Sequence, residues 1–579
     1  MVRFLLRWTV RLLAAIGFVA VLMVAGGLGA AYWFSGLVRS DATMPDQVVL
    51  VADWRGGVPE KPSGFRSIAA LGIGARPSLP EVLVALDRAK RDPRVAGVVA
   101  RVDGTGFSAT AAEELHTAIA ALRDAGKLTA VYADSLGELD GGLVGTYLAA
   151  AFEHVQVQPV GSVAIVGLQS EQVFVRRLLD DYDVDFQVVQ REAFKSALES
   201  VSRTAPSPES AATTRRLLEG LFDELVTGIA RGRGLAVSEV EAAVAAGPLS
   251  AEAARERGLI DEVAHAARLR ELVEDRVGEV GNFDLDRYVD VPLADTPAAE
   301  ATIGFVHAVG PIFRGKSDDP FGDRQIAGDS VAAAIDAARR DDVDAVLLRV
   351  NSPGGSAVAS ETIAAAVRQA RSAGIPVVVS MADVAASGGY WISMDASRIM
   401  ASAMTLTGSI GVIAGKPALA GLLERLGVDV TIVRQGGSGT LTSLVEPWTA
   451  ADLARVDAFV DVAYGQFLER VAAGRDLPVD TVRGLAGGRV WLGREAHANG
   501  LVDDLGGFVD AVAAATEAVG APTGATVELV HYPDAPAPYL RFLRELGLVS
   551  HGLAEVRGLL RAAMAGTALR AEAPAWYVR

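Results

Sequence analysis

Ser387 has the sequence surroundings of a catalytic nucleophile. It lies in the stretch MADVAASGGYW, residues 381–391, among alanines and glycines and just after a strand-like apolar run. Small residues on both sides let the backbone turn sharply and let a substrate chain approach closely. A serine hydroxyl is a weak nucleophile, however, unless a general base lies beside it. The base must therefore come from another part of the chain.

Histidine is the usual base for a serine, but no histidine here has a suitable setting. None lies in a glycine-rich turn or next to a carboxylate on a short loop, so each is interpreted as a structural or surface residue. The seven histidines are His116, His154, His265, His307, His497, His531 and His551. The chain has no cysteine, which excludes a cysteine nucleophile, a disulfide framework and a zinc-thiolate site.

Lysine can replace histidine as the base when desolvation lowers the pKa of its amine. The candidate is Lys195 in REAFKSALES, residues 191–200, where Phe194 and Ala197 make the setting mildly apolar. Local sequence alone favours a surface lysine at the start of a helix. The choice between the two interpretations depends on the rest of the chain.

The chain contains a long internal repeat. VAGVVARVDG, residues 95–104, resembles VDAVLLRVNS, residues 343–352. LLDDYDVDFQVV, residues 178–189, resembles LLERLGVDVTIV, residues 422–433, and the order of the matched segments is the same in both halves. The chain is therefore interpreted as two copies of one ancestral unit.

The repeat separates the serine from the lysine. Gly141-Gly142 matches Gly388-Gly389, which sets Asp140 opposite Ser387. The position equivalent to Lys195 falls in QGGSGTLTS, residues 435–443, which has no lysine. One half thus keeps the serine and the other keeps the lysine, so that only the two halves together supply a complete dyad.

The elements that position these residues follow an α/β pattern. Short apolar runs such as AVLLRV alternate with amphipathic helical stretches, which predicts parallel sheets covered by helices. We expect a first repeat domain over residues 45–294 and a second over residues 295–535. Periodicity is lost near residues 284–300, where Pro and Asp accumulate.

The N-terminus predicts a membrane anchor. Residues 12–37 carry no charged side chain and are long enough to cross a bilayer core, which needs about 20 residues. Arg3, Arg7 and Arg11 precede this run, so residues 1–11 are expected in the cytoplasm and the rest of the chain outside it. The alternative is a cleaved signal peptide, although the run exceeds the ~7–15 residues of a signal h-region. The net charge of −17 argues against nucleic acid as a partner.

Four motifs together resemble one family. They are FKSALE at 194–199, RVNSPGG at 349–355, ASGGYW at 386–391 and LTGSIGV at 406–412. The sequence is similar to the long form of the signal peptide peptidase A (protease IV) family, which has two tandem repeats with a fold like that of the Clp protease and crotonase superfamily. The resemblance implies a membrane-anchored serine endopeptidase that hydrolyses apolar peptides such as signal peptides. It further implies a homotetramer and no metal or organic cofactor.

The resemblance also implies roles for six residues. Ser387 would be the nucleophile, Lys195 the general base, and Ser409 a serine that hydrogen-bonds the lysine. The backbone N–H of Gly388 and one from Gly354 or Gly355 would form the oxyanion hole.

Two features depart from the family pattern. The family often has KSAxEP around its lysine, whereas proline is absent here and LESVS follows at residues 198–202. The C-terminal tail, residues 536–579, is amphipathic and has no recognised counterpart; it either lies on the membrane surface or packs on the protein.

Two other functions fit parts of the sequence. A crotonase-like acyl-CoA enzyme would use a similar SPGG oxyanion hole, but the expected extracytoplasmic location argues against acyl-CoA as a substrate. A non-enzymatic scaffold of two degenerate halves is the other alternative, and it predicts that Lys195 is dispensable.

Overall fold

The computed structural model of the chain describes most of both predicted repeats. It describes residues 44–62, 76–138, 141–291, 299–317, 325–437, 439–522 and 524–533, and the backbone of 570–572. The predicted anchor over residues 12–37, Asp140 and nearly all of the predicted tail lie outside these residues. Within the described chain, no helix has the length and apolarity that crossing a membrane requires.

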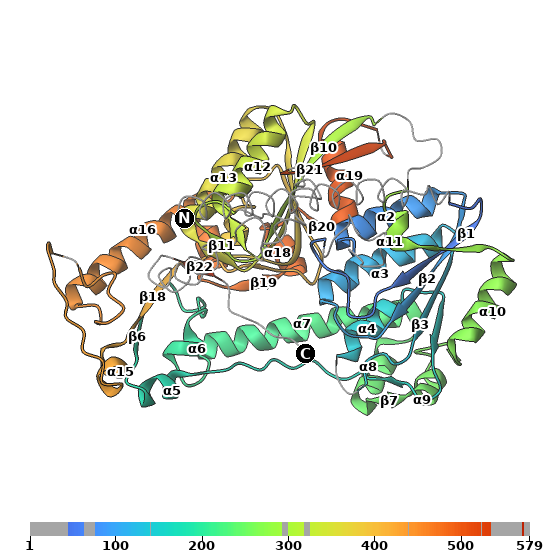
Figure 1. The fold of residues 1–579 in the computed structure, drawn as a ribbon, viewed down its shortest axis with the longest axis horizontal. Helices are drawn as coiled ribbons and strands as arrows, with labels where there is room; N and C mark the ends of the chain where they lie inside the picture. Colours follow the sequence, from blue (N-terminus) through green and yellow to red (C-terminus); the bar gives the residue numbers. More distant parts are fainter. Residues whose placement is uncertain are drawn as a thin grey trace, which may run out of the picture.

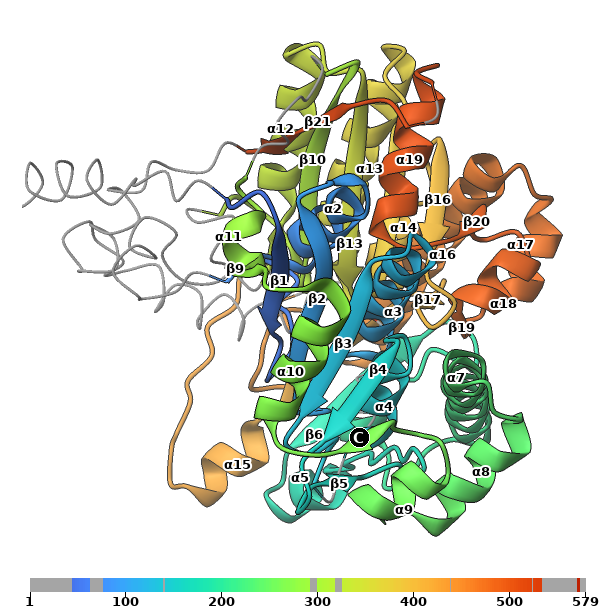
Figure 2. The same ribbon diagram turned by 90° about the vertical axis from the view of Figure 1, so that its right-hand side faces the viewer.

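A six-stranded parallel sheet forms the centre of the first half (Figure 2). Its strands are apolar on both faces, as expected for a sheet covered on both sides by helices. In spatial order they are β8 (Glu262–Val263), β4 (His154–Val157), β3 (Leu128–Ala133), β2 (Val95–Val102), β1 (Val48–Asp53) and β9 (Gly281–Asp284).

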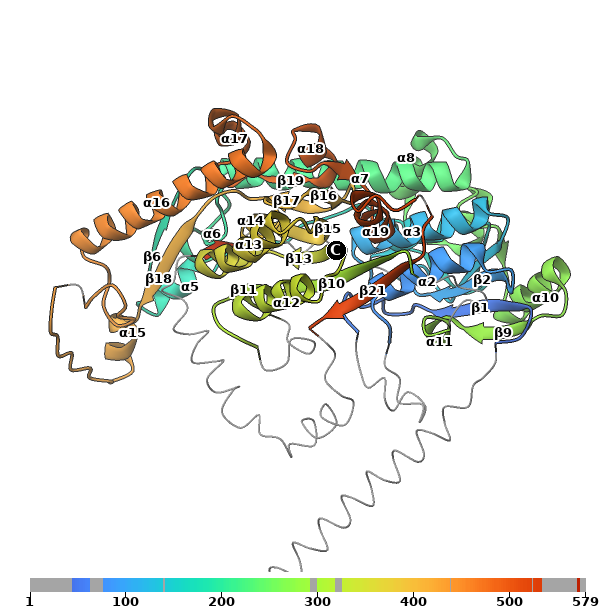
Figure 3. The ribbon, with the colours of Figure 1, turned by 90° about the horizontal axis from the view of Figure 1, so that it is seen from above.

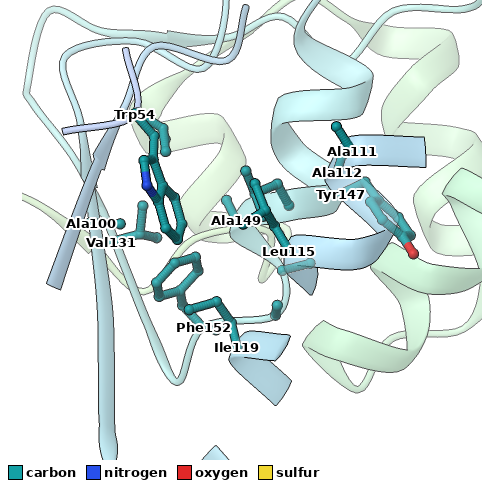
Figure 4. Close-up of a cluster of buried hydrophobic side chains, with 14 of the residues drawn as sticks. Trp54, Ala100, Ala111, Ala112, Leu115, Ile119, Val131, Tyr147, Ala149 and Phe152 are labelled. Atoms are coloured by element: carbon teal, nitrogen blue, oxygen red, sulfur yellow. The ribbon is translucent and has the colours of Figure 1, made fainter. Parts of the chain in front are cut away.

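Helices cover both faces of this first sheet. On one face, α2 (Leu79–Arg91), α3 (Ala109–Asp124) and α4 (Gly142–Ala149) enclose a core in which the rings of Trp54 and Phe152 meet edge to face (Figure 4). On the other face, α10 (Ala266–Val277) packs Leu269 and Val273 against the sheet. Further elements of this half are α5 (Arg176–Asp181), α6 (Glu199–Ser202), α7 (Pro208–Arg233), α8 (Val237–Ala246), α9 (Ala251–Glu256), α11 (Leu285–Tyr288), β5 (Ser162–Val163) and β7 (Leu249–Ser250).

A second, eight-stranded sheet forms the centre of the second half, and all its pairings except β17–β19 are parallel. Its main path is β19 (Val490–Leu492), β17 (Leu406–Gly408), β15 (Val377–Ala386), β13 (Ala345–Ser352), β10 (Ala301–Val309) and β21 (Val527–Tyr532), with β16 (Arg398–Ala401) and β20 (Asp504–Leu505) beside it. The helices of this half are α12 (Gly328–Arg340), α13 (Ala357–Ser372), α14 (Gly388–Trp391), α15 (Ala420–Arg425), α16 (Ala450–Arg475), α17 (Val479–Leu485), α18 (Gly493–Ala498) and α19 (Phe508–Ala518). The predicted pair of parallel sheets covered by helices is thus confirmed.

A third sheet joins the two halves. Its order is β12 (Ile326–Ala327), β11 (Ile312–Phe313), β14 (Gly354–Ser356), β22 (Arg570–Glu572), β18 (Ile413–Ala418) and β6 (Asp185–Gln190). Only β6 comes from the first half, and it pairs antiparallel with β18 along six residues. Figures 1 and 3 show this pair projecting as an arm, with α5 and α15 near its end. The segment that follows β6 is therefore held against the second half.

A buried arginine connects the halves near the centre of the molecule. Arg349 on β13 is completely buried, and its guanidinium donates to both oxygens of Glu114 on α3, at 2.8 Å each. It also donates to Glu60 at 2.6 Å and to Ser380 at 2.9 Å. Removing one partner of such a buried group typically costs about 3–5 kcal/mol, because the remaining charge is left uncompensated.

A second carboxylate at the same junction has a raised pKa. Glu113 on α3 accepts hydrogen bonds from the backbone N–H groups of Ala403 and Met404 in the second half, at 2.9 and 3.1 Å. Burial raises the pKa of the Glu113 carboxyl to about 7, although these two hydrogen bonds oppose the change. The junction between the halves should therefore respond to pH.

We predict that Glu113→Gln weakens the pH dependence of stability. Between about pH 4.5, the usual carboxyl pKa, and about pH 7, folded Glu113 keeps a proton that the unfolded chain has released, so the free energy of unfolding falls as pH rises. The variant lacks this contribution, while Glu60, whose pKa burial also raises to about 7, still provides one. Denaturant unfolding of the full chain in detergent at pH 5 and pH 8 measures the effect. The prediction would be wrong if the free energy of unfolding changed by the same amount between pH 5 and pH 8 in the variant and in the wild type.

Candidate active site

Ser387 lies at the sharp corner between β15 and the short helix α14. Its backbone has φ 57° and ψ −113°, a conformation that non-glycine residues rarely adopt and that costs on the order of 1–3 kcal/mol. Its N–H donates to the carbonyl of Gly408 at 2.8 Å, which holds the corner against β17. The side chain is completely buried in this structure. The fold thus maintains a strained turn at the predicted nucleophile.

Lys195 comes from the first half and ends beside Ser387. It follows β6, and its Nζ lies 2.6 Å from the Ser387 Oγ. The same Nζ donates to the carbonyl oxygen of Ser409 at 3.0 Å and to its Oγ at 3.1 Å. Lys195 is completely buried. The structure thus brings together all three side chains of the predicted serine–lysine–serine group.

Ser409 shares the unusual backbone geometry of Ser387. Its φ is 50°, and its N–H donates to the carbonyl of Arg489 at 2.7 Å, which fixes it at the end of β17. Both serines that contact the amine of Lys195 therefore have a positive φ. Strain of this kind concentrates at functional sites, where the surrounding structure must maintain it.

Two glycines that sequence reasoning missed form the walls around Lys195. Gly488 has φ +83°, and a Cβ there would lie 2.5 Å from the Lys195 backbone nitrogen. A Cβ on Gly411 would lie 3.2 Å from the Lys195 Cδ. In the sequence, the glycine pair at 487–488 was the only sign of a close backbone approach. The folded structure was needed to show that Lys195 is the residue that approaches it. Gly487 also accepts a backbone hydrogen bond from Phe194 at 3.1 Å.

The three glycines predicted to form an oxyanion hole lie together next to Ser387. A Cβ on Gly388 would lie 3.0 Å from the Gly354 Cα and 3.1 Å from the Gly355 nitrogen, so only glycine permits this approach. The N–H of Gly354 donates to the Ser352 Oγ at 3.2 Å. Gly355 lies in the third sheet between Ile312 of β11 and Ala571 of β22.

An extended segment of the chain itself runs through this site. Strand β22 pairs antiparallel with β14, where Gly354 faces Glu572 and Gly355 faces Ala571. Arg570 also pairs with Ile413 of β18. Strands β14 and β18 thus flank a slot that accepts one more strand, next to the predicted oxyanion glycines. Within the described residues, no cluster of three or more His, Asp or Glu side chains is arranged to hold a metal ion.

Comparison with known proteins identifies the class. The model of peptidase family S49 matches residues 122–278 and 369–521, one segment in each half, and the chain belongs to this family. The predicted family resemblance and the predicted enzyme class, a serine protease, are confirmed.

Individual relatives agree with this assignment. The chain is 32% identical to Protease 4 of Haemophilus influenzae, over 76% of this chain and 72% of that one. It is 28% identical to the chloroplastic serine protease SPPA of Arabidopsis thaliana, over 78% and 67% of the two chains. A putative signal peptide peptidase SppA of Enterococcus faecium is 39% identical over 29% of this chain and 49% of its own.

We predict that Gly488→Ala impairs hydrolysis without unfolding the protein. The new methyl group would displace the Lys195 backbone, and a shift of about 1 Å at a catalytic group can cost on the order of 10²-fold in rate. The kcat/KM for a fluorogenic peptide measures the loss. Gly484→Ala is the matched control, because a Cβ on Gly484 meets nothing within 4 Å. Equal kcat/KM in both variants would contradict the prediction.

Proposed function

We propose that Ser387 and Lys195 are the catalytic dyad of a membrane-anchored serine endopeptidase. The observation that carries this proposal is the 2.6 Å approach of the Lys195 Nζ to the Ser387 Oγ inside a completely buried site. Neither half of the chain supplies both groups, which accounts for the retention of two diverged repeats in one polypeptide.

In the proposed acylation step, neutral Lys195 takes the proton of Ser387 as the Oγ attacks the carbonyl carbon of a peptide bond. The carbonyl oxygen becomes an oxyanion, which the N–H of Gly388 and one from Gly354 or Gly355 stabilise. When the tetrahedral intermediate collapses, the C–N bond breaks and the Lys195 ammonium returns its proton to the leaving amine. Two contacts to Ser409 keep the amine oriented throughout.

In the proposed deacylation step, Lys195 deprotonates a water molecule that attacks the acyl-enzyme ester. A second tetrahedral intermediate forms in the same oxyanion hole. Its collapse breaks the bond to the Ser387 Oγ, which recovers the proton from Lys195, and releases the carboxylic acid product. The same lysine thus acts in both half-reactions.

We infer that the substrate binds as an extended strand between β14 and β18. The pairing of β22 with both strands supports this, because it is the geometry that β-strand addition of a peptide requires. Signal peptides and other apolar peptides are the proposed substrates, in line with the name of the Enterococcus faecium relative. A peptide bound in this way must be extended along the slot, so the proposed substrate is an unfolded chain.

We predict that Ser387→Ala and Lys195→Ala each lower peptide hydrolysis by at least ~10³-fold, and that the double variant is no worse than either single one. Groups that act as one unit give such non-additive losses. Lys195→Arg should be equally inactive, because a guanidinium cannot release its proton. The kcat/KM for a fluorogenic peptide measures these losses, and Lys90→Arg on α2 is the control.

Labelling separates this proposal from its alternatives. A fluorophosphonate should label the wild type and fail to label Ser387→Ala. An acyl-CoA hydratase or a non-enzymatic scaffold has no serine nucleophile to label. Full hydrolysis by the Lys195→Ala variant would show that Ser387 uses another base and would exclude the proposed dyad.

The anchor and the location of the enzyme are also proposals. Residues 12–37 would span the cytoplasmic membrane, with residues 1–11 in the cytoplasm and both repeats outside it. Homotetramer formation is proposed from the family resemblance and the two-repeat organisation.

We predict that protease added to intact spheroplasts digests the repeats and leaves only an N-terminal fragment protected. The arginines before the apolar run motivate this orientation. Immunoblotting with N-terminal and C-terminal tags measures it, and lysed spheroplasts serve as the control. Complete protection of the C-terminal tag in intact spheroplasts would contradict the orientation.

A further inference from the structure

An unusually apolar segment of the second half is exposed to solvent. Residues 428–433, VDVTIV, follow α15 and belong to no described strand. Val428, Val430 and Ile432 alternate along it and are 40–47% exposed, and Val433 is 92% exposed. Alternating β-branched residues are typical of a strand, and an exposed apolar segment of this kind is typical of an interaction site.

The counterpart of this segment in the first half is already paired. LLDDYDVDFQVV aligns with LLERLGVDVTIV, so that residues 428–433 correspond to residues 184–189. The latter form most of β6, which follows α5 as 428–433 follow α15. Strand β6 pairs antiparallel with β18 of the second half. The equivalent segment 428–433 has no such partner strand among the described residues.

The counterpart of β18 lies in the first half. The matches of Gly141-Gly142 with Gly388-Gly389 and of VGS with TGS share one offset, which aligns residues 413–418 of β18 with residues 166–171. This segment belongs to none of the described strands, and only Ser170 within it forms an isolated β-bridge. Half-buried and exposed residues alternate along it from Val166 to Glu171, as expected for an extended segment with one covered face.

We propose that this exposed segment, over residues 429–434 of one copy, pairs antiparallel with residues 166–171 of a second copy, in the register of β6 and β18. The inference deepens the proposed homotetramer by naming its contact surfaces. In β6–β18, Gly415 faces Val188 and Lys416 faces Gln187. The same register sets Leu168 and Gln169 of the second copy opposite Ile432 and Thr431 of the first.

The proposed contact is head to tail, because it joins the second half of one copy to the first half of the next. Each copy then offers its segment 429–434 to one neighbour and its segment 166–171 to another. A heterologous contact of this kind closes into a ring when the rotation between copies permits it. Around that ring, the β6–β18 pairing inside each chain would alternate with the proposed pairing between chains. Both pairings would have the same strand geometry.

Cysteine cross-linking of the full chain in detergent tests the register. The chain has no cysteine, so Gln169→Cys and Thr431→Cys can be made as two separate proteins, each with one thiol. Both positions are exposed. Oxidation of the two proteins mixed and re-equilibrated should give a two-chain disulfide product at least several-fold above either protein alone. A chain carrying both changes should give a ladder of linked copies that ends at the ring size.

The control mixes Thr431→Cys with Glu241→Cys, an exposed position on α8. Product no greater than this control would overturn the proposal. Efficient cross-linking of Thr431→Cys to itself would also overturn it, because that indicates a symmetric contact. The same experiment in a Ser387→Ala background should give the same product. A failure of the proposed dyad therefore leaves this result unchanged, and the two proposals can fail separately.

A strand-breaking variant gives a second, independent measurement. Thr431→Pro removes a backbone donor from the proposed ladder at a position that is exposed within one copy. The wild type should have the mass of an oligomer in a mass-resolving measurement, and the variant should shift toward a single chain with unchanged circular dichroism. A wild-type monomer, or an oligomer that Thr431→Pro leaves intact, would overturn the proposal.

Discussion

The antiparallel pairing of β6 with β18 is the constraint on which the rest of the site depends. Strand β6 leaves the first half and lies along the second half for six residues, and Lys195 follows it after a short turn. Without this ladder, the amine would have no fixed position relative to Ser387. Backbone hydrogen bonds thus convert a large separation in sequence into a 2.6 Å contact.

The contact between Lys195 and Ser387 requires strained backbone at two serines and the absence of a side chain at Gly488. Ser387 and Ser409 both adopt a positive φ, and Gly488 leaves room for the Lys195 backbone where a Cβ would collide with it. A preorganised site of this kind holds its reacting groups in place before a substrate binds. The free energy that it costs must come from the surrounding structure, mainly from the two large apolar cores.

The junction between the halves is linked to the same site through β13. This strand carries Arg349, which pairs with Glu114 and Glu60, and it leads within a few residues to Gly354 and Gly355. The ion pairs of the junction and the two glycines are therefore positioned by the same strand. The serine and the lysine come from different halves, so the geometry of the junction bears directly on their distance.

The sequence by itself determined the α/β class, the repeat, and the assignment of Ser387 and Lys195 to different halves, because hydrophobic periodicity and repeat alignment are local or pairwise properties of the chain. Those patterns also predicted the parallel sheets, which the structure confirms. Only the tertiary structure decided that β6 crosses onto β18, that Gly411 and Gly488 line the lysine, and that β22 occupies the slot beside Gly355. These features depend on which segments meet in space. Sequence patterns indicate that a strand or a glycine turn will form, but the partner of an edge strand is set by the packing of the whole chain.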